Sequence, residues 1–291
     1  MKIKLCHFLI FILFINLGCQ NQTVLTEPLD EKETNFKIEI FHPNKISTKE
    51  YSENTFSFTY DENSIFVSRT SGWEFQAGFI STRQNKTYSE LIPVALLDSI
   101  YNGAINPSGN KIIFCSKING KDEIYLIEKI QNSWSNKVNL SEKSGIYGGY
   151  FYWFSDTELY LYVPEQNGNL VKANLLGDDL KVTDRLPQLN TKDATEFSIY
   201  IDKKKSFLIF TRYQEKKESE QGFFISFNLS DFESPNWSKP QKIESLPYGW
   251  NPYIKEDKDQ FLFSDGNDII YLPMDKIRTE IMKLKNTATN K

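Results

Sequence analysis

The sequence contains few of the side chains from which metal sites and catalytic triads are built. Three of its 291 residues are Cys and two are His, and His7 lies in the N-terminal apolar segment described below. Metal sites and Ser-His-Asp triads need several such groups that converge on one point. We therefore expect His42 to be a turn or packing residue, and we predict no metal site, no cofactor and no catalytic residue. A glycine-rich phosphate-binding loop is also missing.

Excess positive charge is missing as well. The chain has 34 Lys and Arg against 38 Asp and Glu, which gives a formal net charge of −4. Because nucleic-acid binding depends on clustered positive charge, no nucleic-acid partner is expected. Aromatic side chains, by contrast, are abundant, with 22 Phe, 15 Tyr and 5 Trp. This composition can bury apolar surface, and it favours β-strands over disorder.

A single apolar run, residues 8–15, follows the positively charged Lys2 and Lys4. It is shorter than the roughly 20 residues that a membrane-spanning helix needs, and the arrangement is typical of a secretory signal. The run leads to Leu17-Gly18-Cys19, which resembles the lipoprotein box of bacterial envelope proteins, although Asn16 stands where that box usually has Leu. The resemblance implies cleavage after Gly18 and lipidation of Cys19. An ordinary signal peptide or an uncleaved anchor is the alternative.

These features divide the chain into a signal peptide at residues 1–18, a flexible tether at 19–35, one domain at 36–285 and a disordered tail at 286–291. The tether is polar and acidic, as a flexible linker often is. Lipid on Cys19 would hold the protein at the outer membrane of a bacterial envelope, facing the periplasm or the surface, because two or more acyl chains anchor stably. Cys115 lies in an apolar run, so we expect it to be buried.

A weak repeat of about fifty residues runs through the domain. Its clearest part is an apolar run that ends in a hydroxyl residue and often a basic one. A polar turn precedes the run, and another apolar or aromatic run precedes the turn, so each unit begins as a hairpin. A third apolar run and a more polar fourth run follow. The runs that define the repeat are residues 65–69, 112–117, 159–163, 207–212 and 261–264.

Four short strands in each unit of about fifty residues are typical of a β-propeller. The predicted fold class is all-β, a single propeller of five four-stranded blades, and a sixth, degenerate blade around residues 212–250 is the alternative. The fifth unit lacks its own fourth run, because residues 274–285 are helix-like. Residues 43–48 match the fourth run at 240–245. This match predicts that the N-terminal strand completes the last blade, which would remove exposed sheet edges.

Two segments carry a resemblance to a known family. Residues 106–114 with 122–126, and residues 263–271, resemble the WD-repeat-like propeller repeat of TolB-type proteins, although the third and fourth units lack the Pro and Gly of the turn. Residues 40–43 with 46–48 are similar to the opening of lipoproteins of this group in Bacteroidetes-type bacteria. The resemblance implies an exported propeller that binds proteins or surface components.

The candidate binding residues lie where the innermost strands are expected to begin. Aromatic side chains recur there, and their flat faces suit a sugar or a peptide, although packing between blades is the favoured explanation for them. Carboxylates at Glu53, Glu196 and Asp98 could serve a glycan-active hydrolase, which needs paired acidic groups in the funnel. We expect a membrane-anchored, non-enzymatic binding or scaffolding module for an envelope protein or glycan; the alternatives are the hydrolase and a structural accessory of a surface complex. The candidate funnel residues are Tyr51, Glu53, Tyr147, Glu196, Tyr248 and Trp250.

Overall fold

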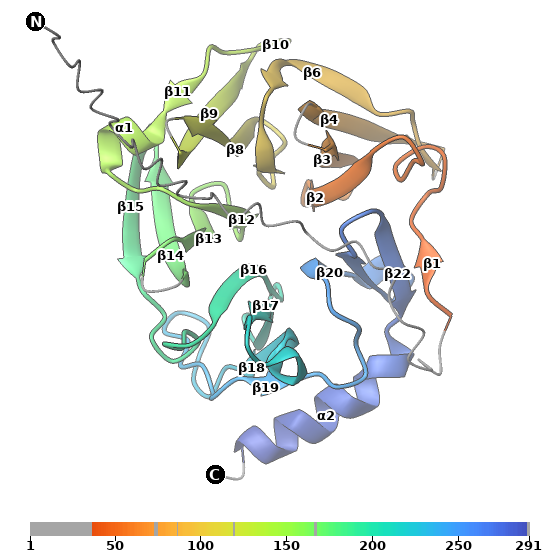
Figure 1. Cartoon of the computed structure of the whole chain (residues 1–291), viewed down its shortest axis with the longest axis vertical. Helices are drawn as coiled ribbons and strands as arrows, with labels where there is room; N and C mark the ends of the chain where they lie inside the picture. Colours follow the sequence, from red (N-terminus) through yellow and green to blue (C-terminus); the bar gives the residue numbers. More distant parts are fainter. Residues whose placement is uncertain (1–36, 73–74, 86, 119, 166–167, 290–291) are drawn as a thin grey trace, which may run out of the picture. The chain divides into compact units, whose positions relative to one another are not determined.

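The computed structural model describes residues 37–72, 75–85, 87–118, 120–165 and 168–289. The predicted signal peptide, the cleavage site after Gly18, the lipidated Cys19 and the tether lie outside these residues. The described chain forms five antiparallel sheets arranged as the blades of a β-propeller (Figure 1). The predicted propeller of five blades is thereby confirmed, and residues 212–250, all of which are described, contain no sixth sheet.

In the first two blades the outermost position is shared by two strands. In both blades the third strand is long enough to pair with two partners in succession. Blade 1 comprises β2 (Ser52–Phe58), β3 (Ser64–Ser71), β4 (Phe75–Gln84), β5 (Thr87–Tyr88) and β6 (Ile92–Asp98), and blade 2 comprises β7 (Tyr101–Ile105), β8 (Lys111–Ile118), β9 (Lys121–Ile130), β10 (Ser133–Trp134) and β11 (Val138–Asn139).

Blades 3 and 4 have four strands each, and the short helix α1 (Leu140–Ser144) leads into blade 3. The Asn139 side chain caps this helix by accepting from the backbone N–H of Glu142. Blade 3 comprises β12 (Gly149–Trp153), β13 (Glu158–Val163), β14 (Asn169–Leu176) and β15 (Asp179–Asp184), and blade 4 comprises β16 (Thr195–Ile201), β17 (Phe207–Tyr213), the 3₁₀ turn η1 (Glu218–Glu220), β18 (Gly222–Phe227) and β19 (Gln241–Lys242).

The N-terminal strand closes the ring, as the sequence predicts. Blade 5 comprises β20 (Trp250–Lys255), the 3₁₀ turn η2 (Glu256–Lys258), β21 (Gln260–Ser264), β22 (Ile269–Pro273) and, as its outermost strand, β1 (Glu39–Ile40). The register differs from the one implied by the sequence match. Glu39 and Ile40 pair with Tyr271 and Ile270, whereas residues 43–48 form the turns that follow. The match failed in register because the shared Pro-Lys-Ile pattern is local, while the backbone that bonds to β22 is that of residues 39–41.

A hydroxyl or thiol residue at or near the end of the second strand has a structural role in four of the five blades. Its side chain bonds to the backbone at or just before the first strand of the next blade, and each such bond satisfies a buried backbone group between blades. The side-chain and backbone partners are Ser68 with Gly103 N–H, Cys115 with Gly148 O, Thr211 with Gly249 O, and Ser264 with Glu53 O. Cys115 is fully buried, as predicted.

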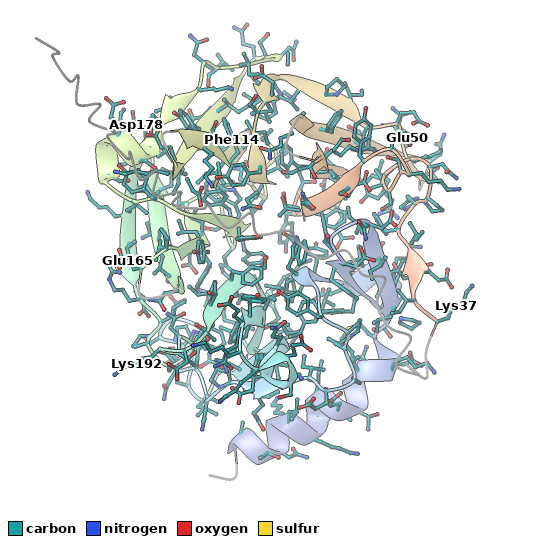
Figure 2. All side chains as sticks on the ribbon, viewed as in Figure 1. Lys37, Glu50, Phe114, Glu165, Asp178 and Lys192 are labelled. Atoms are coloured by element: carbon teal, nitrogen blue, oxygen red, sulfur yellow. The ribbon has the colours of Figure 1, made fainter. Side chains whose placement is uncertain are left out.

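The hydrophobic cores lie between adjacent blades, so the blades depend on one another for stability. One cluster joins Tyr160 and Leu170 of blade 3 to Ile199 and Phe210 of blade 4. Phe114 is fully buried in another cluster, whereas charged side chains such as Glu165 and Lys192 lie at the periphery (Figure 2). Most of the aromatic excess is therefore core.

A C-terminal helix, α2 (Asp275–Thr289), packs against the outer side of blades 4 and 5. Ile277 is buried in the core cluster shared by these blades, and Ile281 and Leu284 pack against that cluster. The helix continues past Lys285, so residues 286–289 are helical and the predicted disordered tail is wrong for this part. The reason is that the apolar spacing continues to Ala288, which also contacts the cluster. Neither helix of the described residues is long and apolar enough to cross a membrane.

Candidate functional site

The five innermost strands gather their beginnings at one end of the central channel and their ends at the other. Bonds between neighbouring blades show this alignment. The Ile105 N–H donates to Ser57 Oγ over 2.7 Å, and the Asn251 side chain donates to Phe56 O over 2.7 Å. We call the two regions the start end (residues 51–53, 147–149, 195–196 and 248–250) and the turn end (residues 58–62, 105–109, 153–157 and 201–205).

At the start end, the Glu53 carboxylate is sealed inside the protein. The residue is 0% exposed. Arg69 Nε lies 2.9 Å from its Oε1, and the Thr48 backbone N–H donates to Oε2 over 3.2 Å. The Arg69 guanidinium also donates to Ile46 O over 3.0 Å, which fixes the loop before the blade. Burial raises the pKa of Glu53 to about 7 against the opposing influence of Arg69.

Glu196 in blade 4 repeats this arrangement. It is also 0% exposed, its Oε1 lies 2.8 Å from Arg212 Nε, and the Thr191 backbone N–H donates to it over 3.2 Å. The Arg212 guanidinium donates to Leu189 O over 3.2 Å. Burial again raises the pKa of the carboxyl, with Arg212 acting against it. Two units thus use one Thr-Glu-Arg network with identical sequence spacing, which identifies it as an internal structural brace.

The carboxylates suggested for a hydrolase do not gather in an open funnel. Glu53 and Glu196 have no exposed surface, so neither can contact a substrate in this conformation. Asp98 ends the outer strand β6, where its side chain is 87% exposed and pairs with Lys137 at 3.4 Å. The arrangement does not fit two facing, accessible acids.

The four aromatic candidates at the start end are packed against neighbouring groups. All four are half-buried, and their contacts match the alternative in which they serve packing. Tyr51 lies 5.4 Å below the Arg69 guanidinium, Tyr147 lies 4.9 Å from Lys121 Nζ, Tyr248 packs edge-on to Trp250 at 6.4 Å, and Trp250 Nε1 donates to Asn54 O over 2.7 Å.

At the turn end the channel holds a cavity of about 240 Å³. An engineered apolar cavity of about 150 Å³ binds benzene, while drug-sized pockets begin at about 300 Å³. The cavity therefore has room for one ring with a short arm. It is formed by all five blades, and the described residues that line it are Phe56, Ser57, Phe58, Thr59, Tyr60, Ile105, Pro107, Tyr150, Phe151, Tyr152, Trp153, Phe154, Ser198, Ile199, Lys203, Phe232, Asn251, Pro252 and Tyr253.

β-Bulges place several of these side chains. Each innermost strand shifts register once against the second strand of its blade. Tyr150, Ser198 and Asn251 lie at such shifts with left-handed backbone, at φ of 52°, 51° and 59°. A bulge re-aims a side chain relative to the regular pleat, and an L residue with positive φ is strained. Three residues with this strained backbone therefore line the cavity.

Ser198 differs from the other serines of the channel. It is 3% exposed and lines the cavity. Its hydroxyl has no hydrogen-bond partner among the described residues. Leaving a buried hydroxyl without a partner costs about 1–3 kcal/mol, so natural proteins rarely do so without a reason.

The rim of the cavity carries exposed aromatic rings and one lysine. Tyr60 is 69% exposed and Phe232 is 43% exposed. Lys203 Nζ, from blade 4, lies 4.8 Å from the centre of the Tyr60 ring of blade 1, so this side chain reaches across the mouth. Its ion pair with Glu256 is long, at 3.9 Å, and both side chains are about half exposed. Such contacts are weak.

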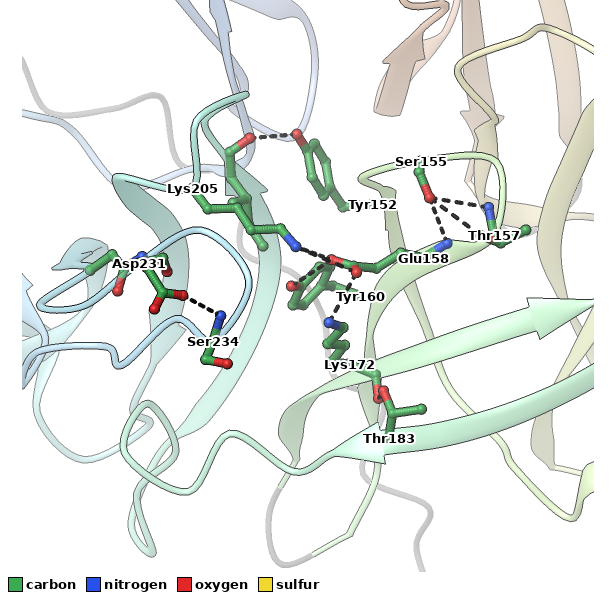
Figure 3. A network of polar contacts seen from close by, with 12 residues as sticks. Tyr152, Ser155, Thr157, Glu158, Tyr160, Lys172, Thr183, Lys205, Asp231 and Ser234 are labelled. Atoms are coloured by element: carbon green, nitrogen blue, oxygen red, sulfur yellow. Dashed lines mark hydrogen bonds and ion pairs between the residues drawn. The ribbon is translucent and has the colours of Figure 1, made fainter.

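A second lysine, Lys205, forms a polar network with Glu158 and Lys172 (Figure 3). Lys205 Nζ lies 3.1 Å from Glu158 Oε1, and 4.4 Å and 4.7 Å from the rings of Phe154 and Phe232. Lys172 pairs with the second oxygen of Glu158 at 2.9 Å. Burial acts to raise the pKa of Glu158, but the hydrogen bonds and charges of the two lysines outweigh it, so its pKa is lowered. Lys205 has φ of 49° where the equivalent turn of blade 2 has Gly109.

Few residue patterns in the sequence pointed to the turn end. Phe232 lies on the connection at residues 228–240, within the stretch that we considered for a sixth blade. That connection is instead a loop tied by its own bonds, for example from Ser230 N–H and Asn236 N–H to Asn228 Oδ1, both at 3.0 Å. The one available signal was the absence of the turn Gly from the fourth unit, where Lys205 stands.

A larger groove, of about 660 Å³, runs beside β1. It holds several cations, but Arg83 lies 3.6 Å from Asp257 and Lys255 pairs with both Glu62 and Asp257. Its charges are therefore largely satisfied within the protein. The described residues contain no cluster of three or more His, Cys, Asp or Glu that could hold a metal ion.

Comparison with known proteins gives likeness of fold. No family model and no curated protein matches the sequence. Among solved structures, TolB from Acinetobacter baumannii is 13% identical over 75% of this chain and 53% of its own, with a TM-score of 0.45. A candidate TolB from Agrobacterium tumefaciens is 10% identical over 73% and 69%, with a TM-score of 0.48. A candidate 6-phosphogluconolactonase from Bacteroides uniformis is 13% identical over 75% and 80%, with a TM-score of 0.46.

The chain thus spans about half the length of the first of these proteins. The structural neighbours include TolB proteins. Identities of 10–13% concern the fold and leave activity and partners open.

Proposed function

We propose that the propeller is a non-enzymatic binding module whose turn-end cavity receives a ring-sized, largely apolar group of a partner molecule. The observation that carries this proposal is the aromatic cavity formed by all five blades, with the partnerless Ser198 hydroxyl inside it. Concave apolar sites with a few placed polar groups are the usual form of ligand sites. Exposed aromatic rings at the rim, here Tyr60 and Phe232, are the usual anchors of recognition surfaces.

The hydrolase alternative has less support. It requires two accessible carboxylates, whereas Glu53 and Glu196 are buried and form ion pairs with Arg69 and Arg212. The cavity at the other end is lined by aromatic, hydroxyl and amide groups and by the Lys203 ammonium. Such a lining binds a ligand by shape and dispersion.

The proposal places the module on the bacterial envelope. It rests on the signal-like residues 1–18 and on Cys19 as the lipidated residue. A Cys19→Ala variant should appear in the soluble fraction, without acyl label, while the wild type pellets with membranes. Acyl labelling that persists in the variant would contradict the anchor and would leave the binding role untouched.

Photocrosslinking in the native envelope tests the binding role. Benzoylphenylalanine replaces Tyr60 at the rim or, as a control, Leu176 at the end of β14 in blade 3, which is equally exposed at 66%. We expect a discrete adduct from position 60, none from position 176, and loss of the adduct when Phe232→Ala is added. Adducts of equal yield at both positions, or none at position 60, would overturn the proposal.

A further inference from the structure

We infer that the cavity selects a small ring-bearing carboxylate, with the ring inside the channel and the carboxylate at Lys203. This inference rests on the proposed function and names the chemical class of its ligand. Three features carry it: the size and lining of the cavity, the charge at its mouth, and the partnerless hydroxyl within it.

The ring is favoured by the walls. Blades 1 and 3 each contribute two aromatic rings to the cavity wall, namely Phe56 and Phe58, and Tyr152 and Trp153. Aromatic pairs prefer offset or edge-on contacts at 4.5–7 Å between ring centres, and the wall rings already keep such contacts, as between Phe58 and Tyr253 at 4.7 Å. A volume of about 240 Å³ admits one further ring and a short arm.

The negative charge is favoured by the mouth. Among the described lining residues, Lys203 is the one with a charged side chain. The aromatic faces at the rim, which would attract a cationic ligand, are already covered by the protein's own cations: Lys203 lies on Tyr60, and Lys205 lies between Phe154 and Phe232. Lys205 is neutralised by Glu158 at 3.1 Å, whereas the one ion pair of Lys203 among the described residues is the 3.9 Å contact with Glu256. Lys203 is therefore the cation available to an anion.

A hydrogen-bonding group on the ring is favoured by Ser198. Its hydroxyl is buried and lacks a partner among the described residues. Ser198 lies on β16 and Lys203 lies in the turn that follows, and both line the same cavity. We therefore expect a phenol with a short carboxylate arm to bind with its hydroxyl at Ser198 and its carboxylate at the flexible Lys203 side chain.

Calorimetric titration of the purified domain tests the inference. The probes are 3-(4-hydroxyphenyl)propionate, its amide, and 3-phenylpropionate. We expect a dissociation constant on the order of 0.1 mM for the phenolic acid, about tenfold weaker binding of the amide, and about fivefold weaker binding of the acid without the phenol.

Single substitutions assign each preference to one residue. Lys203→Ala should remove the preference for acid over amide, while Lys204→Ala, in the same turn but outside the cavity, should leave it unchanged. Ser198→Ala should remove the preference for the phenol and keep the preference for the acid. A phenylalanine-terminated peptide with a free C-terminus is compared with the phenolic acid, and the amidated peptide serves as its control. Tighter binding of the peptide indicates that the acid is the end of a chain, and tighter binding of the phenolic acid indicates a free molecule.

The inference is overturned if acid and amide bind equally, if Lys203→Ala preserves their ratio, or if none of the probes binds. These results leave the photocrosslinking at position 60 as an independent test of the binding role. An adduct there together with no preference for acids would keep the module and discard the ligand class.

Discussion

The two ends of the five innermost strands differ in how their polar and aromatic side chains are partnered and exposed. At the start end, the charged side chains of Glu53 and Glu196 are fully buried and each is met by an arginine and a threonine. At the turn end, a hydroxyl is left without a partner at Ser198, and the rings of Tyr60 and Phe232 remain exposed.

The polar groups of the two ends differ in whether they have partners, and this difference distinguishes groups that hold the blades together from groups that we propose bind a ligand. Polar groups that are buried and satisfied specify how blades meet, because removing one partner leaves the other uncompensated. A buried group without a partner and exposed aromatic rings contribute nothing to the fold that would keep them there. Charge and aromaticity at a strand beginning predicted a site, whereas exposure distinguishes the two ends: Glu53 and Glu196 are buried, and the rings of Tyr60 and Phe232 are exposed.

The largest effect is expected from breaking a start-end network. Arg69→Ala should lower the free energy of unfolding by about 3–5 kcal/mol, because it leaves the Glu53 carboxylate buried without its cation. Arg212→Ala should do the same in blade 4. The measurement is urea unfolding, with Lys143→Ala, from the exposed pair with Asp178, as the control that should cost under about 1 kcal/mol. A loss below about 1 kcal/mol for Arg69→Ala would remove the distinction between the ends.

Phe232→Ala tests the turn end in the opposite sense. Because the ring is 43% exposed and sits on a self-bonded loop, we expect the free energy of unfolding to change by less than about 1 kcal/mol. Binding of the phenolic acid should weaken about tenfold through the loss of a rim anchor. Unchanged affinity would show that the rim takes no part in binding.

Two hydroxyl deletions compare a satisfied group with an unsatisfied one. Thr211→Val removes the 3.0 Å bond to Gly249 O between blades 4 and 5 and should cost about 1 kcal/mol or slightly more. Ser198→Ala should raise the free energy of unfolding by about 1 kcal/mol, because it removes a buried hydroxyl that has no hydrogen bond to lose. Thermal unfolding of both variants measures this, and equal losses would mean that Ser198 is satisfied in solution.

The smallest effect is on pH dependence, and its sign differs between the ends. The pKa of Glu53 is raised to about 7 in the folded protein, so its contribution to stability is present below about pH 4.5 and is lost as the pH rises through about 7. The pKa of Glu158 is lowered, so its contribution is present above about pH 4.5 and is lost as the pH falls.

Urea unfolding of Glu53→Gln and Glu158→Gln across this range isolates the two contributions. The stability advantage of the wild type over Glu53→Gln should shrink from about pH 4.5 to 7.5. Its advantage over Glu158→Gln should grow from about pH 3 to 5. Changes of the same sign would contradict the assignment.

Much of the fold could be predicted from the sequence, because the hairpin signals are local. The hydroxyl residue near the end of the second strand marked the repeat, and in blades 1, 4 and 5 it is the group that bonds to the next blade. The register of closure could not be read, since Glu39 and Ile40 contact β22 across more than 200 residues. For the site, residue type placed Glu53 on the correct strand but gave no hint of its partner 16 positions later. Phe232 escaped notice because tertiary packing alone brings its loop over the channel.

Fluorine NMR of the domain labelled with 5-fluorotryptophan tests directly whether the ligand binds at the turn end of the channel. Trp153 lines the cavity at the turn end, while Trp250 lies at the start end. Assignment by Trp→Phe variants gives a reporter at each end of the same channel. On addition of 3-(4-hydroxyphenyl)propionate, we expect a saturable shift of the Trp153 resonance and no shift of the Trp250 resonance. A shift of Trp250 with Trp153 unchanged would contradict this expectation.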